Sequence, residues 1–262
     1  MLLDLKMIHE TAIVHPSAKI AENVEIGPYA IIDKDVCIGA GTIIKEHALI
    51  RENTTIGKKN IIFQYSTIGE IPQDLKFDNE ITTCTIGDNN TFREYCSIHR
   101  GTLDGISDTR IGDNNLFMAY THVAHDCTIG HRCILSNGAS LAGHVNLDSN
   151  VSLGGFTLVH QFCHIGEYAF SGLGTVISQD VTPYTLVAGN HAKAYKINSV
   201  GLKRKGFDEK IILELEKTFK LFVKSKKTKS DREKIYSESN LSNQYTDKFV
   251  RFILDSQRGI TR

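Results

Sequence analysis

An aliphatic side chain at every sixth position is the feature that most constrains this chain. From Ile8 to Ile68 every sixth residue is Ile or Val, without exception. The same spacing returns in phase at residues 86, 92 and 98, shifts by one residue, and runs from residue 111 to residue 177 with Ser171 as the exception. An α-helix repeats every 3.6 residues and a flat strand every 2, so the fold itself must repeat every six residues.

A second position of the repeat carries a small side chain. Four residues after the aliphatic position stand Ala12, Ala30 and Ala48, among others. One large and one small residue in every six predict a short strand and a turn around a narrow interior. Three such units form an 18-residue coil of triangular section, and successive coils pair as parallel strands about 4.8 Å apart. The chain is therefore predicted to be mainly β, a parallel β-helix of hexapeptide repeats.

Glycine often follows the aliphatic residue directly, as at Gly27 and Gly39. We expect these glycines to mark the corners of the coil, where the backbone would adopt a conformation that a Cβ disfavours.

Charge and length limit the classes of function. The 262 residues contain 30 basic and 30 acidic side chains, which argues against bulk affinity for nucleic acid or stable membrane insertion. No stretch approaches the roughly 20 apolar residues of a membrane span. The first seven residues contain no hydrophobic core of signal-peptide length, so we expect a cytoplasmic location.

The cysteines fit the repeat better than a disulfide or metal pattern. No Cys-x-x-Cys pair exists. Five cysteines occupy the small-residue position, so we expect buried apolar side chains and no metal site. They are Cys84, Cys96, Cys127, Cys133 and Cys163.

Three interruptions divide the repeat. Residues 70–80 must leave the column, because Asp74 and Glu80 stand where aliphatic residues are due. Residues 99–110 contain the one-residue shift, and residues 180–184 are predicted to end the column. We place the β-helix domain at residues 1–190.

From Phe207 onward the period becomes helical, and a helical domain is predicted for residues 191–262. Asp208 can cap a first helix, a second begins near Ser230, and a third contains Phe249. The apolar stripe of the first helix comprises Ile211, Ile212, Leu215, Phe219 and Phe222.

A coil of 18 residues places positions 125, 143 and 161 above one another. His122, His125, His144 and His160 are then expected on one edge, pointing outward. Any one of them alone is more often a tolerated surface residue, but the stacked group favours a site. Histidine is suited to removing a proton from a hydroxyl near neutral pH. The Asp126 carboxylate would fix its tautomer if a corner turns it toward the ring, and the Gly143 N–H would stabilise an oxyanion.

Several segments resemble the acyl-ACP:UDP-N-acetylglucosamine O-acyltransferases, and the resemblance covers essentially the whole chain. These segments are residues 124–145, Gln73-Asp74-Leu75-Lys76, Ile98-His99-Arg100-Gly101, His160-Gln161-Phe162, Gly189-Asn190-His191-Ala192 and Gly201-Leu202-Lys203-Arg204.

The resemblance implies a left-handed β-helix and a homotrimer with its site between neighbouring subunits. It also implies transfer of a 3-hydroxyacyl group from acyl carrier protein to the glucosamine 3-OH of UDP-N-acetylglucosamine, the first step of lipid A biosynthesis, without a cofactor.

The resemblance also implies roles for single residues. His125 matches the general base, Asp126 its support and Gly143 the oxyanion donor. Residues matched to substrate contacts are Gln73, Asp74, Lys76, His122, His144, His160, Gln161, Asn198 and Arg204; Leu173 and His191 match the acyl groove.

Two positions depart from the family pattern. Val200 stands where members often have an acidic residue that helps to hold the nucleotide. Leu173 replaces the Gly of some members, so we expect a shorter preferred acyl chain. The acceptor can be UDP-N-acetylglucosamine or its 3-amino analogue.

Three alternatives remain at this stage. A zinc-dependent carbonic anhydrase of the β-helical type would use His122, His125 and His144 as ligands. An acetyl-CoA-dependent sugar acetyltransferase would share the coil but lack the helical tail. A non-catalytic scaffold would give the histidine cluster no purpose.

Overall fold

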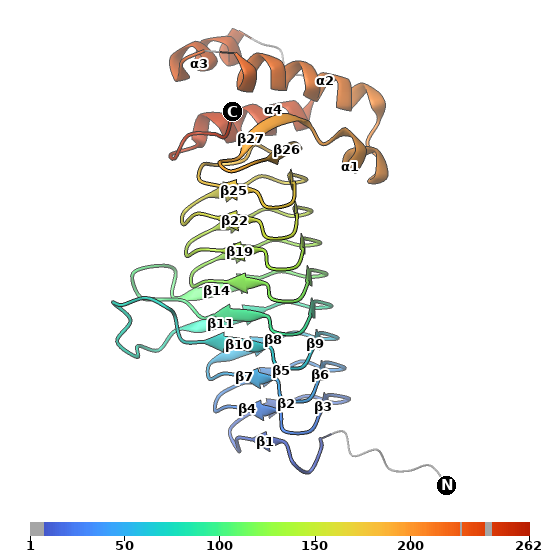
Figure 1. Ribbon diagram of the computed structural model, residues 1–262, viewed down its shortest axis with the longest axis vertical. Coiled ribbons are helices and arrows are strands. Elements are labelled where there is room, and N and C mark those ends of the chain that lie inside the picture. Colours follow the sequence, from blue (N-terminus) through green and yellow to red (C-terminus); the bar gives the residue numbers. More distant parts are fainter. Residues whose placement is uncertain (1–7, 226, 239–242) are drawn as a thin grey trace.

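The computed structural model describes residues 8–225, 227–238 and 243–262. These residues form a tall column with helices packed over the end where the chain finishes (Figure 1). Residues 1–7, on which the expectation of a cytoplasmic location depends, lie outside the described residues.

Three sheets form the sides of the column. The first contains β1 (Ile13–Val14), β4 (Ile31–Ile32), β7 (Leu49–Ile50), β10 (Thr67–Glu70), β13 (Ser97–His99), β16 (His122–Val123), β19 (Ser140–Leu141), β22 (Leu158–Val159) and β25 (Val176–Ile177). The second contains β2 (Lys19–Ile20), β5 (Cys37–Ile38), β8 (Thr54–Ile56), β11 (Thr83–Ile86), β14 (Asp108–Ile111), β17 (Thr128–Ile129), β20 (Asn146–Leu147) and β23 (His164–Ile165). The third contains β3 (Glu25–Ile26), β6 (Ile43–Ile44), β9 (Ile61–Ile62), β12 (Thr91–Phe92), β15 (Leu116–Phe117), β18 (Ile134–Leu135), β21 (Ser152–Leu153), β24 (Phe170–Ser171), β26 (Thr185–Ala188) and β27 (Lys193–Ile197).

The predicted repeat sets the register. Ile32 pairs in parallel with Ile50, eighteen residues later, and both side chains are buried. The small-residue position is buried as well, as at Ala30 and Ala48. The five cysteines of the small-residue position are buried inside the column as free thiols, as predicted. Stacked aliphatic side chains along the axis are therefore the core.

The expected role of the glycines after the aliphatic residue is confirmed only at Gly69, whose φ is 78°. At the other glycines of this position φ is not positive, and the left-handed conformation falls two residues later, at Tyr29 (φ 57°) and Gly41 (φ 70°). A Cβ on Gly39 would lie 2.5 Å from the carbonyl carbon of Gly57 in the next coil. Glycine is needed at that position for lack of space between coils, not for its backbone freedom.

Both predicted excursions leave the column on one side (Figure 1). The first inserts twelve residues, because Thr67 pairs with Ser97, and a multiple of six preserves the phase. The second inserts seven, because Thr83 pairs with Asp108, and this accounts for the one-residue shift. The excursions touch each other through an ion pair between Lys76 and Asp104 (3.3 Å).

The column does not end at residues 180–184 as expected. Val181 bridges Ile165, and β26 pairs in parallel with β24 at a spacing of sixteen residues. The six-residue phase is lost there while the coil continues. β27 then pairs with β26 as an antiparallel strand. The division between residues 190 and 191 falls in the connection between these two strands, and it stays a prediction.

The helical region contains α1 (Ser199–Arg204), α2 (Glu209–Phe219), the π-helical segment η1 (Lys220–Lys224), α3 (Lys229–Glu238) and α4 (Gln244–Asp255). Asp208 caps α2 as predicted, accepting from the Lys210 N–H at 2.7 Å. The predicted stripe packs inward, with Leu215 fully buried. The short α1 was not anticipated. None of the described helices combines the length and apolar character needed to cross a membrane.

Candidate active site

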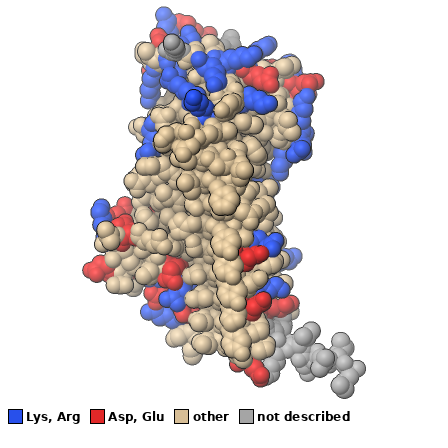
Figure 2. Space-filling view, viewed as in Figure 1, with Lys and Arg blue, Asp and Glu red and all other residues tan. Residues whose placement is uncertain are grey.

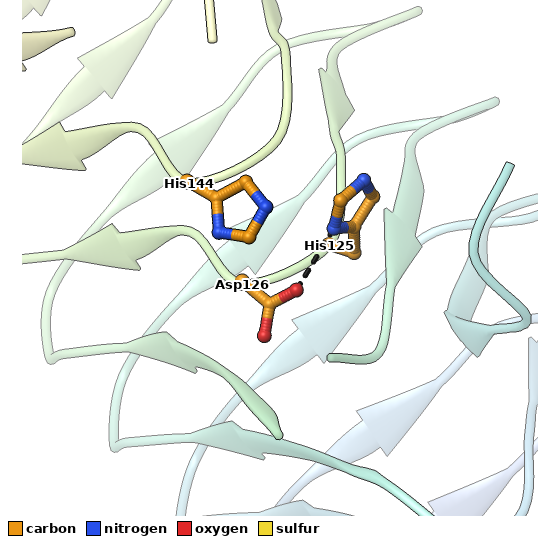
Figure 3. Close-up of side chains that lie close together, drawn as sticks. All are labelled: His125, Asp126 and His144. Atoms are coloured by element: carbon orange, nitrogen blue, oxygen red, sulfur yellow. Dashed lines mark hydrogen bonds and ion pairs between the residues drawn. The ribbon is translucent and has the colours of Figure 1, made fainter. Parts of the chain in front are cut away.

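The histidine cluster occupies the corner that follows the first sheet (Figure 3). His122 lies in β16, and His125 and Asp126 form the turn between β16 and β17. One coil further, Gly143 and His144 occupy the equivalent turn between β19 and β20. Residues separated by about one coil in sequence therefore share one corner, as predicted.

His125 and Asp126 form a hydrogen-bonded pair. The His125 Nδ1 lies 2.8 Å from the Asp126 Oδ2. Neighbouring residues of a strand point to opposite faces, but Asp126 has a φ of 59°, and this corner conformation turns its carboxylate back toward the ring. A proton held on Nδ1 leaves the lone pair on Nε2, the arrangement that a general base requires.

The Asp126 carboxylate is buried but well provided with donors. Burial alone would raise its pKa, yet hydrogen bonds from His125 and Thr102 outweigh it, so the pKa lies below its ordinary value. Asp126 thus remains ionised beside His125 at neutral pH.

Two further imidazoles flank His125. The His144 ring meets the His125 ring edge-on at 5.0 Å and stacks on Phe162 at 4.5 Å. The His122 Nδ1 lies 2.6 Å from the Ser97 Oγ. Burial lowers the pKa of both His122 and His144, which favours their neutral forms at pH 7.

Gly143 lies against the His125 ring. A Cβ at this position would stand 2.7 Å from the His125 Cε1, so only glycine allows the ring to pack there. Among the described residues, no acceptor is recorded for the Gly143 N–H. This donor is therefore available to a ligand beside the imidazole.

A groove of about 410 Å³ opens at this corner. It is lined by polar and apolar groups from three successive coils and by one residue of the first excursion. The lining residues are Gln73, His122, Ala124, His125, Ser140, Leu141, Ala142, Gly143, Leu158, Val159 and Gln161.

The remaining predicted residues lie around this groove or away from it. Asp74 and Lys76 line an adjoining pocket between the two excursions. The exposed His160 lies 3.3 Å from an Arg258 nitrogen near the end of the chain. Leu173 is exposed at a corner between β24 and β25.

Three predicted residues stand at the helical end. His191 is exposed in the connection between β26 and β27. Asn198 caps α1 by accepting from the Gly201 N–H at 3.2 Å and donates to the Tyr168 carbonyl. Arg204 is exposed at the end of α1. In Figure 1, α1 and the excursions lie on opposite sides of the column.

Sequence reasoning missed the groups behind Asp126. Thr102 and Ile106, from the second excursion, donate to its carboxylate, and the Asp126 N–H donates to the Thr109 Oγ1. The one-residue shift between residues 99 and 110 was the available signal, since it marked an insertion beside the histidines.

Two other chemistries were tested against the site. Cys127 is fully buried and burial raises the pKa of its thiol to about 12, so it is unsuited to act as a nucleophile. His125, Asp126 and His144 each place a donor atom within 4.8 Å of the others. This group differs from the three histidines that the zinc alternative requires.

Comparison with known proteins identifies the family. A sequence model described as UDP-N-acetylglucosamine O-acyltransferase, domain 2, matches residues 180–261, and a bacterial transferase hexapeptide model matches residues 17–52 and 108–143. An acyl-[acyl-carrier-protein]–UDP-N-acetylglucosamine O-acyltransferase from Alkalilimnicola ehrlichii is 51% identical over 255 residues, covering 97% of this chain and 99% of its own. A Pseudomonas putida enzyme of the same name is 45% identical over 98% of this chain and all of its own. The chain belongs to the acyl-ACP–UDP-N-acetylglucosamine O-acyltransferase family.

The three-dimensional comparison agrees with this assignment. The structure of LpxA from Acinetobacter baumannii superimposes with a TM-score of 0.94 at 43% identity, covering 98% of this chain and 100% of that one. The predicted left-handed parallel β-helix is confirmed, and the protein is an acyltransferase. The match of the helical tail to the family model removes the support for a plain sugar acetyltransferase.

Proposed function

We propose that this acyltransferase moves a (3-hydroxy)acyl group from acyl carrier protein to the 3-OH of UDP-N-acetylglucosamine, the first step of lipid A biosynthesis. The close relatives carry these substrates in their names. The observation that carries the mechanism is the His125–Asp126 pair beside the free Gly143 N–H in one open groove.

The reaction proceeds by direct transfer. The His125 Nε2 removes the proton of the sugar hydroxyl, and the oxygen attacks the thioester carbonyl carbon. The oxyanion that forms accepts from the Gly143 N–H. Collapse of this intermediate breaks the C–S bond, and the thiolate of the carrier leaves with the proton held by the imidazolium. Asp126 stabilises that imidazolium without itself becoming protonated.

The groove walls supply the substrate contacts. Gln73, His122 and Gln161 line the groove, and His144 packs edge-on against His125 beside it, so these residues orient the sugar nucleotide. Asp74 and Lys76 adjoin it through the neighbouring pocket. Asn198 and Arg204 bind the nucleotide, His191 and Leu173 contact the acyl chain, and Val200 removes one nucleotide contact.

Lysine and arginine side chains gather at the helical end of the molecule (Figure 2). Exposed ones on β27, on α1 and directly after α1 include Lys193, Lys196, Lys203, Arg204 and Lys205. A carrier protein presents its acyl chain on a prosthetic arm that bears a phosphodiester, so positive charge at this end favours docking of the donor.

We also propose a cytoplasmic location, where both substrates are available, and no cofactor or metal is required.

A homotrimer accounts for the distance between the two parts of the site. His125 lies next to the second excursion, because Thr102 of that excursion bonds its partner Asp126. Asn198 caps α1 and Arg204 ends it, and α1 lies on the other side of the column from the excursions (Figure 1). The nucleotide can contact both only if α1 of a neighbouring copy approaches the groove.

The central test is His125→Ala, assayed with UDP-N-acetylglucosamine and acyl carrier protein loaded with different acyl chains. We expect turnover to fall about 1000-fold, the usual contribution of a general base. His131→Ala is the matched control, because His131 also pairs with an aspartate, Asp113, at 3.1 Å on another corner of the column. Near-normal turnover of His125→Ala would refute the mechanism.

Leu173 bears on the length of the acyl chain. It reaches over the coil below, where a Cβ on Gly155 would lie 3.1 Å from its Cδ1. We expect Leu173→Gly to shift the preferred donor by at least two carbons toward longer chains, because we infer from the family resemblance that this side chain limits the space for the acyl chain. A series of acyl carrier proteins with increasing chain length measures this. If the unaltered enzyme already prefers the longest donors, the expectation is wrong.

A further inference from the structure

The second excursion encloses the carboxylate of Asp126. The Thr102 N–H lies 3.2 and 3.1 Å from its two oxygens, the Thr102 Oγ1 lies 2.7 Å from Oδ2, and the Ile106 N–H lies 2.9 Å from Oδ1. His125 bonds the same Oδ2 at 2.8 Å. The hydroxyl of Thr102 and the imidazole of His125 therefore share one oxygen atom of the pair.

The loop is shaped for this enclosure. The Thr102 carbonyl accepts from the N–H groups of Gly105 and Ser107, both at 3.1 Å, which folds the loop over the carboxylate. A Cβ on Gly105 would stand 2.2 Å from the Asp126 Cγ, so no larger residue fits. The Asp126 side chain is completely screened from solvent.

We propose that Thr102 is a positioning residue for the acyl transfer, acting through Asp126 on His125, and that Gly105 makes room for it. An aspartate in this role must stay ionised and fixed in direction so that the base keeps its proton on Nδ1 and its lone pair on Nε2. Backbone donors from a rigid loop achieve both, and the Thr102 hydroxyl selects which oxygen faces the imidazole. The inference rests on the proposed role of His125 as general base.

The test compares Thr102→Val with Thr102→Ser. Valine keeps the shape and the backbone N–H but loses the hydroxyl, whereas serine keeps the donor. We expect Thr102→Val to lower kcat about tenfold and to leave the KM for UDP-N-acetylglucosamine within twofold of the unaltered value. The acid limb of the kcat/KM profile should move to higher pH, because a carboxylate with one donor fewer holds the imidazolium more strongly. Thr102→Ser should restore both values.

Two other variants bracket the result. Thr83→Val is the matched control, since the Thr83 hydroxyl also donates to an aspartate, Asp108, at 2.8 Å, without contact to His125. It should leave kcat and the pH profile unchanged. Gly105→Ala should displace the Asp126 carboxylate and lower kcat at least 100-fold while the far-ultraviolet circular dichroism remains that of the unaltered enzyme.

A double-mutant cycle separates this inference from the proposed function. If Thr102 acts through the pair, Thr102→Val lowers turnover in the unaltered enzyme but not in His125→Ala. An equal loss in both backgrounds, a wild-type pH profile for Thr102→Val, or equal damage from Ser and Val would overturn the role of Thr102. Full activity of His125→Ala on its own would instead overturn the general base.

Discussion

His99 is a buried histidine next to the proposed site. Its side chain packs edge-on against His122 with ring centroids 4.8 Å apart, and only 3% of the residue is exposed. Among the described residues, nothing bonds its Nδ1. Burial, with smaller contributions from His122 and His125, lowers its pKa from 6.5 to about 4. His99 is therefore neutral at pH 7, and it adds no charge beside the proposed base His125.

This burial predicts an acid-sensitive stability. The unfolded chain binds a proton at His99 below pH 6.5, whereas the folded protein resists it until about pH 4. Stability is thus lost as the pH falls from 6.5 to 4, by about 3 kcal/mol from this residue. Between pH 7 and pH 4 we expect the free energy of unfolding to fall by about 3 kcal/mol less in His99→Gln than in the unaltered protein. Urea unfolding at each pH measures this difference.

His15→Gln, which alters an exposed histidine of the first coils, serves as the control. Identical pH dependence in the unaltered protein and in His99→Gln would show that His99 is not held neutral by its surroundings.

A ladder of aromatic rings, four exposed tyrosines and one half-buried histidine, follows one corner of the column. Successive centroids are 5.0 to 5.3 Å apart and the planes differ by 2° to 13°. The rings occupy the left-handed turn position of this one corner, which recurs once per coil, so the spacing of the coils sets the spacing of the stack. The ladder consists of Tyr29, His47, Tyr65, Tyr95 and Tyr120.

Tyr65 stands in the middle of the ladder, between His47 and Tyr95, and 48% of the residue is exposed. We expect Tyr65→Ala to lower the free energy of unfolding by about 1–2 kcal/mol, because it removes two stacked contacts. Chemical denaturation measures the change. Tyr195→Ala is the control, as Tyr195 is similarly exposed on β27 and has no stacked ring among the described residues. Equal effects of the two substitutions would contradict a role for stacking.

The whole molecule separates the two halves of the proposed site. The second excursion contacts the His125–Asp126 pair, and α1, which contains Arg204, lies on the opposite side of the column from the excursions (Figure 1). A protomer of 29.2 kDa should therefore assemble into a species of about 88 kDa, measured by light scattering.

Complementation tests the shared site directly. His125→Ala and Arg204→Ala should each be inactive as homotrimers. When they are co-expressed with different tags and purified as mixed trimers, one of the three interfaces joins an intact His125 to an intact Arg204 of the neighbouring subunit. We therefore expect about a third of wild-type turnover. If turnover does not recover in mixed trimers, either both residues act in a site formed within one subunit or Arg204 is not part of the active site.

Much of the fold could be predicted because the six-residue period reflects how the side chains pack. A side chain such as Ile32 must contact Ile50 in the next coil, so the spacing of aliphatic residues in the sequence gives the number of residues in each coil. The cap at Asp208 and the stripe around Leu215 were predictable for the same local reason. The extra coil through β26 was not, because its spacing of sixteen residues leaves no six-residue signal.

By itself, the sequence determined the column, its helical end and the corner on which His125 and His144 meet, since residues about one coil apart fall together in any such column. Only the tertiary structure decided the environment of Asp126. A positive φ turns that carboxylate toward its neighbour, and an inserted loop of no regular period brings Thr102 and Ile106 to it. Contacts made by an irregular loop depend on its three-dimensional path, which no repeat in the chain specifies.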